Sequence, residues 1–237
     1  MVGEQDRKTR KKRVRKWMTK RKNQKLRDRK IYTVGGEIFS SITHGLTALV
    51  GLALLTLCIV TAAQNGWQWF VILSICVFGV AAIAGFVIST VYHALAVNSG
   101  KRVMRILDYC SIYWIIAATY TPFCIIVLNN WIGWTILAVN WTACIIGTTL
   151  TAIDRRRFKK FSLICYLVMG WAAVPAAWPL IQSIGLGAPF WLLLGGGVAY
   201  TLGAIVFKMK GKYTHGIWHL FTMAGLVCQF LSIYFLL

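Results

Sequence analysis

Seven long apolar runs constrain the fold of this 237-residue chain more than any other feature of the sequence. They lie at residues 38–62, 67–96, 106–128, 131–153, 161–181, 189–207 and 215–237. Each run is near the ~20 residues that an α-helix needs to span a bilayer. Hydrophobic residues make up 58% of the chain, which is more than an ordinary soluble domain carries. The sequence therefore predicts an all-α integral membrane protein with seven transmembrane helices.

Basic residues separate these runs in an alternating pattern. All 26 Lys and Arg lie in the first 30 residues or in three connections, at residues 98–105, 154–160 and 208–212. The three intervening connections hold none. Because Lys and Arg are retained on the cytoplasmic side of a membrane, the N-terminus is predicted to be cytoplasmic and the C-terminus outside. This pattern is typical of a multi-pass protein of the cell membrane.

The first 34 residues are predicted to be a basic cytoplasmic tail, ahead of a membrane domain formed by residues 35–237. Residues 1–30 carry 15 Lys and Arg against three acidic residues, and they have too few apolar residues to form a core. Ahead of a membrane domain, such a segment is typical of a topology signal that also contacts anionic lipid headgroups. No fold or base-reading motif accompanies it, so no nucleic-acid partner is expected.

Four histidines and one aspartate lie near the ends of the apolar runs. In the alternating topology, His44, Asp108, His215 and His219 come early in outward-running helices, and His93 comes late in an inward-running one. All five residues are therefore predicted to lie in the cytoplasmic third of the bilayer. His215 and His219 are four residues apart, which places both imidazoles on one helical face. This shared depth predicts a single site built from four helices.

The residue types at this depth favour a metal site. Three neutral imidazoles suit zinc, and a catalytic zinc keeps its fourth position open for water. We therefore expect His93, His215 and His219 to bind Zn²⁺. Asp108 is the candidate general base that hydrogen-bonds this water and accepts its proton. Ser89 is one turn before His93 on the same face and is the second candidate for the catalytic group.

Two residues of the first run, Glu37 and His44, keep more than one interpretation. They are seven residues apart and share a helical face. His44 either orients a ligand or is itself a fourth ligand, and a fourth ligand would make the site closed and structural. Glu37 either supports the site, caps its helix or pairs with a basic residue of a connection. Any single histidine here could instead extend toward the lipid headgroups, but the shared depth of the set disfavours that interpretation.

Four ordered motifs carry a resemblance to a known family. They are Glu-Ile-Phe-Ser-Ser-Ile-Thr-His-Gly at 37–45, Ser-Thr-Val-Tyr-His at 89–93, Arg-Ile-Leu-Asp at 105–108 with Thr-Tyr-Thr-Pro-Phe at 119–123, and His-Gly-Ile-Trp-His at 215–219. These motifs resemble those of the hemolysin III family, the bacterial branch of the progestin and adipoQ receptors, although Ser40 stands where many members have Asn. The resemblance covers residues 35–237 and implies a seven-helix protein of a bacterial cell membrane with an inward N-terminus.

The same resemblance carries expectations about the site. In the related adiponectin receptors, zinc is held by three histidines that match His93, His215 and His219. Residues that match Asp108 and Ser89 stand near the zinc-bound water of those receptors. The family is also similar to alkaline ceramidases, which are membrane zinc amidases. The resemblance therefore implies hydrolysis of an amide or ester bond in a membrane lipid.

A non-catalytic role is the alternative, so whether the protein is an enzyme stays open at this point. In that alternative the protein is a sensor or regulator of membrane state, or a cytolytic protein as the family name suggests, and its zinc is structural. The number of metal ligands distinguishes the two readings. Three histidines with an open position favour the hydrolase, whereas a fourth protein ligand favours structural zinc.

Overall fold

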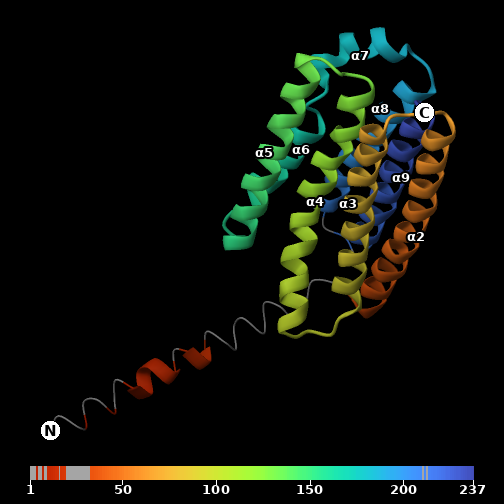
Figure 1. Cartoon of the computed structure of the whole chain (residues 1–237). Helices are drawn as coiled ribbons and strands as arrows, with labels where there is room; N and C mark the ends of the chain where they lie inside the picture. The colour runs from red at the N-terminus through yellow and green to blue at the C-terminus, as the bar shows by residue number, and fades with distance from the viewer. Residues whose placement is uncertain are drawn as a thin grey trace. The chain divides into compact units, whose positions relative to one another are not determined.

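The computed structural model describes Glu4, Arg7 and residues 10–15, 17–19, 33–209, 211 and 213–237 (Figure 1). The chain divides into two units, Met1–Val34 and Gly35–Leu237. In the first unit, residues 10–15 and 17–19 are helical. The rest of the basic segment, on which the lipid-contact prediction falls, lies outside the described residues.

The described chain from Val34 onward consists of helices, with no strand among the described residues. The elements are α2 (Val34–Gln64), α3 (Trp69–Ala94), α4 (Ser99–Ile126), α5 (Trp131–Asp154), α6 (Lys159–Gly170), the short 3₁₀-helix η1 (Val174–Ala176), α7 (Ala177–Ile184), α8 (Ala188–Lys208) and α9 (Thr214–Tyr234). They form seven spans long and apolar enough to cross a membrane, with α6, η1 and α7 together making one of them. The predicted all-α fold with seven transmembrane helices is confirmed, and the orientation of its termini stays a prediction.

The third span begins earlier than the apolar run indicated. Helix α4 starts at Ser99 rather than at residue 106. Asn98 precedes it, and its side chain accepts a hydrogen bond from the backbone N–H of Lys101 (2.8 Å). This contact satisfies one of the free N–H groups in the first helical turn. The basic connection predicted at residues 98–105 is therefore mostly helical, and Lys101 and Arg105 project from the first two turns of α4.

The fifth span is interrupted, where the single apolar run had predicted one continuous helix. Helix α6 ends at Gly170, and η1 contains Pro175, whose ring prevents an α-helix from continuing through this segment. Tyr120 of α4 compensates for the interruption, because its hydroxyl donates to the Gly170 carbonyl (2.8 Å) and accepts from the Ala173 N–H (3.2 Å). Broken backbone is tolerated at membrane depth when a neighbouring helix satisfies it in this way.

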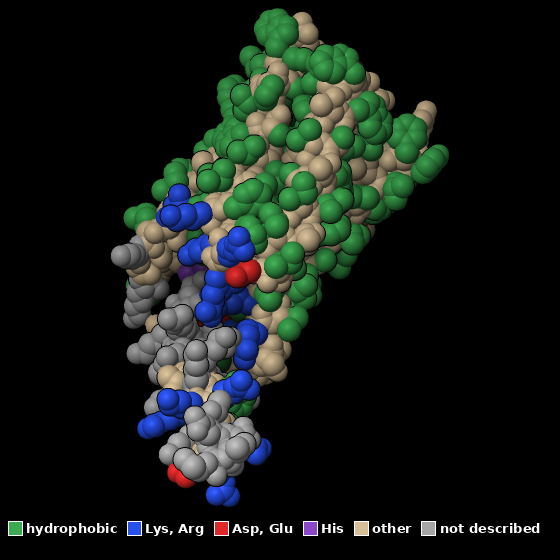
Figure 2. All heavy atoms as spheres, turned by 90° about the vertical axis from the view of Figure 1, so that its left-hand side faces the viewer, with side chains coloured by type: hydrophobic (Ala, Val, Ile, Leu, Met, Phe, Trp, Pro, Cys, Tyr) green, Lys and Arg blue, Asp and Glu red, His purple; other side chains and the backbone are tan. Residues whose placement is uncertain are grey.

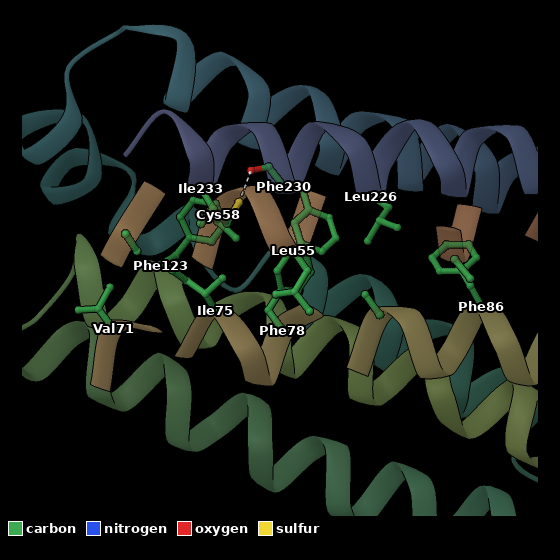
Figure 3. Packing of buried hydrophobic residues seen from close by; sticks show 13 residues of the cluster. Leu55, Cys58, Val71, Ile75, Phe78, Phe86, Phe123, Leu226, Phe230 and Ile233 are labelled. Carbon is green, nitrogen blue, oxygen red and sulfur yellow. Dashed lines mark hydrogen bonds between the residues drawn. The ribbon is translucent and has the colours of Figure 1, made fainter. Parts of the chain in front are cut away.

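An apolar core joins α2, α3 and α9 (Figure 3). Leu55 of α2, Phe78 of α3 and Phe230 of α9 are buried in it, and the last two stack with ring centroids 4.5 Å apart. The C-terminus is tied to the α2–α3 connection, since Trp67 Nε1 donates to the Leu237 carbonyl (2.9 Å). The C-terminus therefore lies at the end of this core opposite the last turn of α3.

The outer surface of the helical unit is apolar. Figure 2 shows hydrophobic side chains over most of the visible face of this unit. Large exposed side chains include Leu49, Trp69, Ile145 and Trp191. An aqueous surface of this composition would be unusual, whereas lipid tails solvate it well. The exposed surface therefore agrees with a multi-pass membrane protein.

Candidate metal centre

All four histidines of the chain lie together at one end of the α2–α3–α9 core. His44 lies on α2, His93 on the last turn of α3, and His215 and His219 on the first two turns of α9. The residues His44, His93 and His219 are at most 6% exposed, and His215 is half-buried. Neighbouring ends of α2, α3 and α9 thus bring together residues that are far apart in the sequence.

Three of these imidazoles converge on one another. A ligand nitrogen from each of His93, His215 and His219 lies within 4.8 Å of the other two. The Nε2 atoms of His215 and His93 are 3.3 Å apart, and those of His219 and His215 are 2.9 Å apart. Among the described residues, this trio is the group of His, Cys, Asp and Glu side chains that could hold a metal ion.

Glu37 contacts Nδ1 of His93, whereas Nε2 of the same ring faces His215. That Nδ1 atom lies 2.6 Å from Glu37 Oε2, and Lys101 Nζ donates to Glu37 Oε1 (2.9 Å). A carboxylate paired with an ammonium is ionised and can only accept hydrogen bonds. The proton of a neutral His93 ring therefore sits on Nδ1, and the lone pair on Nε2 faces His215. Carboxylates orient metal-binding histidines in this manner.

The donor set fits a divalent metal. Nitrogen ligands about 2.0–2.1 Å from one tetrahedral ion are separated by about 3.3 Å. The measured Nε2 separations of 3.3 and 2.9 Å are close to that value. Without a cation, neutral imidazoles whose Nε2 lone pairs all point inward would repel one another. Imidazole nitrogen suits zinc, copper, iron and nickel, so these residues could hold a metal ion but do not specify which metal.

His44 does not belong to the converging trio. Its Nε2 atom contacts Nδ1 of His219, the ring nitrogen that faces away from His215. Its ring also lies edge-on against Phe86, with the centroids 5.0 Å apart. His44 is thus placed behind His219, as Glu37 is placed behind His93. Whether His44 orients His219 or is itself a fourth ligand stays a prediction.

Asp108 and Ser89 lie beside the imidazoles rather than among them. Ser89 is buried on α3, and the partly buried carboxyl of Asp108 projects from α4. His93, Arg105 and Arg155 are among the charged or titratable groups that act on that carboxyl. The Asp108 carboxylate is outside the group of atoms that lie within 4.8 Å of one another.

The sequence did not identify Lys101 as part of this region. It predicted only that Glu37 could pair with some basic residue of a connection. The missing signal was the helical start at Ser99, which carries Lys101 toward the end of α3. Asn is a preferred N-cap residue, so Asn98 could have indicated a helix start here, although the basic residues that follow it are not typical of a first helical turn.

The fold and this cluster define a class, the seven-helix membrane proteins with three imidazoles converging at one end. The sequence matches the family described as "Haemolysin-III related" over residues 32–230. The chain belongs to that family, which confirms the resemblance carried by the four motifs.

Named relatives agree with this assignment. The chain is 38% identical to "Hemolysin-3" of Bacillus cereus over 200 residues, which is 84% of this chain and 90% of that protein. It is 34% identical to "Hemolysin-3 homolog" of Bacillus subtilis (strain 168) over 86% of this chain and 96% of that protein. It is also 28% identical to human "Monocyte to macrophage differentiation factor" over 67% of this chain and 68% of that protein. No solved structure matches the chain.

Proposed function

We propose that this protein is a zinc-dependent hydrolase that cleaves an amide or ester bond of a membrane lipid. The observation that carries the proposal is the number of converging imidazoles. Ligand nitrogens of three histidines, rather than four, lie within 4.8 Å of one another. His44 lies behind His219, so a metal held by the trio would keep a position open. Catalytic zinc sites have such an open position, whereas structural sites are filled by four protein ligands.

The side chains would divide the work as follows. His93, His215 and His219 would hold the ion, which when bound supplies a Lewis acid for the scissile carbonyl and lowers the pKa of water. Asp108 would accept the proton of the attacking water as general base. Ser89 would orient the Asp108 carboxylate by donating a hydrogen bond to it.

Asp108→Asn tests this division of work. The amide keeps the shape of the side chain but cannot take a proton. We expect the variant to retain its metal and to lose hydrolysis of lipid amides and esters by about 10²–10⁴-fold, as is usual when a general base is removed. The measurement combines metal analysis of purified protein with turnover of a lipid amide and ester panel. Loss of metal from the variant would make Asp108 a ligand and would contradict the assigned role.

A non-catalytic role is the second candidate, and the names of the two bacterial relatives favour it. Hemolysin-3 is named for lysis, so this chain could regulate or disrupt membranes while using its metal structurally. The same experiment separates the candidates. If wild type and Asp108→Asn are equally inactive across the panel while both alter membrane permeability alike, the hydrolase proposal fails and the second candidate stands.

We further propose that the imidazole end of the helices faces the cytoplasm of a bacterial cell. The complete segregation of Lys and Arg to one set of connections supports this orientation. A reporter fused after Leu237 is expected outside, and one inserted in the connection between α5 and α6 is expected inside. A cytoplasmic C-terminus would overturn the proposed orientation.

Residues 1–30 are proposed to bind anionic lipid headgroups. Fifteen cations in this segment would attract a negatively charged leaflet, and salt would weaken that attraction. A peptide of residues 1–30 should bind vesicles that contain anionic lipid and release them as the salt concentration rises. Equal binding to uncharged vesicles would contradict the proposal.

A further inference from the structure

Lys101 contacts three of the groups that surround His93. Its ammonium donates to Glu37 Oε1 (2.9 Å) and to the backbone carbonyl of Leu95 (3.0 Å). It also lies 5.1 Å from the centre of the ring of Tyr92, the buried residue directly before His93. The Lys101 side chain is 14% exposed and that of Glu37 is 22% exposed. An ion pair at this degree of burial is less weakened by solvent than one on an open surface.

The ends of α2 and α3 suit the charges of this pair, although the first turn of α4, which carries Lys101, does not favour a cation. Glu37 is in the first turn of α2, where the helix dipole favours an anion. Leu95 directly follows α3, so its carbonyl belongs to the negative end of that helix, where a cation is favoured. Lys101 projects from the first turn of α4 and reaches both groups. It therefore joins the ends of α2, α3 and α4 at the metal-binding end of the molecule.

We infer that Lys101 is a positioning residue for the metal site and that it acts on His93 through Glu37. Lys101 holds the Glu37 carboxylate in place through its hydrogen bond to Oε1, and Oε2 of Glu37 in turn contacts Nδ1 of His93, so that Nε2 of His93 faces His215. The hydrogen bond from Lys101 to the Leu95 carbonyl holds the end of α3, from whose last turn His93 projects. The inference rests on the proposed metal site, and it adds a residue of α4 that never touches the metal.

The first test is metal affinity in the purified full-length protein, measured by competition with a chelator for Zn²⁺. Glu37→Gln should weaken zinc binding by about 10–100-fold, the usual cost of removing a group that orients a ligand. Lys101→Met should weaken it by about 10-fold, because Glu37 would remain but lose its partner. Arg102→Gln is the matched control, since it removes an exposed cation next to Lys101.

Two further variants distinguish positioning from a general loss of structure. Lys101→Arg keeps the cation and should restore most of the affinity. The combination of Glu37→Gln and Lys101→Met should cost little more than Glu37→Gln alone, because coupled residues are not additive. Equal affinities for Lys101→Met and Arg102→Gln, or fully additive losses in the double variant, would overturn the inference and leave the proposed metal site standing.

A second measurement tests the inference without any metal. Solid-state ¹⁵N NMR of the metal-free protein reports which ring nitrogen carries the proton, and a chain with four histidines gives a spectrum that can be assigned. His93 should be protonated at Nδ1 in wild type and in Arg102→Gln, and should lose this preference in Lys101→Met. No preference in wild type, or an unchanged one in Lys101→Met, would overturn the inference. A wild type that binds no metal would overturn the proposed metal site alone.

Discussion

Helices α8 and α9 are neighbours of almost equal apolarity, but they are buried to very different degrees. In the most apolar 18-residue stretch of α9, 44% of residues are buried, against 11% in α8. The mean hydropathy of the same stretches is 1.5 for α9 and 1.8 for α8, so the less apolar helix is the more buried one. Hydropathy thus identifies residues that enter the membrane, but it does not separate the interior of the bundle from its lipid-facing surface.

Polar side chains separate the two helices better than apolar ones do. Helix α9 buries His219, Thr222, Gln229 and Ser232, whereas the fully buried residues of α8 are two glycines. Polar groups at membrane depth face the interior of a bundle, because lipid tails cannot satisfy their hydrogen bonds. The α2–α3–α9 core therefore contains the candidate site, and the proposed metal binding should depend on α9 much more than on α8.

The largest effect should come from the converging imidazoles themselves. Replacing any one of His93, His215 and His219 by Ala leaves two ligands, so zinc affinity should fall by more than the roughly 100-fold that an orienting residue can cost. Zinc content and chelator competition measure this loss. A variant of this set that keeps its affinity within the range of an orienting residue would remove that histidine from the metal site.

The sequence predicted the parts of this arrangement that depend on depth in the membrane. The apolar runs give the spans, and the alternation of Lys and Arg predicts that His44, His93 and the α9 pair share one level. Since helices at one level need only pack laterally to bring such residues together, their convergence could be anticipated. Local spacing also placed His215 and His219 on one face.

Contacts that depend on rotation and tertiary packing could not be predicted from the sequence. The placement of His44 behind His219 depends on the rotation of α2 about its own axis. A rotation by the angle between successive residues would point His44 away from His219. The interruption before η1 depends on Pro175 and also on Tyr120, which lies on another helix and satisfies the broken backbone. The contact of Lys101 with Glu37 was not predicted, because the apolar run begins at residue 106 whereas α4 begins at Ser99.

An intermediate effect is expected for His44, which contacts a ligand without joining the trio. His44→Ala would free Nδ1 of His219 and allow its ring to turn, so zinc affinity should fall by about 10–100-fold. His44→Gln, whose amide group can form a hydrogen bond with Nδ1 of His219, should recover part of the affinity. If His44→Ala instead removes zinc as completely as His219→Ala does, His44 is a fourth ligand and the structural reading of the metal gains support.

The smallest effect on metal binding should come from α8. An alanine Cβ at Gly203 would lie 2.9 Å from Cβ of Phe221 and 3.0 Å from the ring of Trp218, both on α9. The two helices would have to separate, which should destabilise the protein by about 1–3 kcal/mol. Gly195→Ala on the same helix is the matched control, because nothing lies within 4 Å of its Cβ. Thermal unfolding in detergent should show a lower midpoint for Gly203→Ala only, and zinc affinity should be unchanged in both variants. A parallel fall in zinc affinity for Gly203→Ala would mean that α8 holds α9 in its metal-binding position, and the contrast between the two helices would then apply to burial alone.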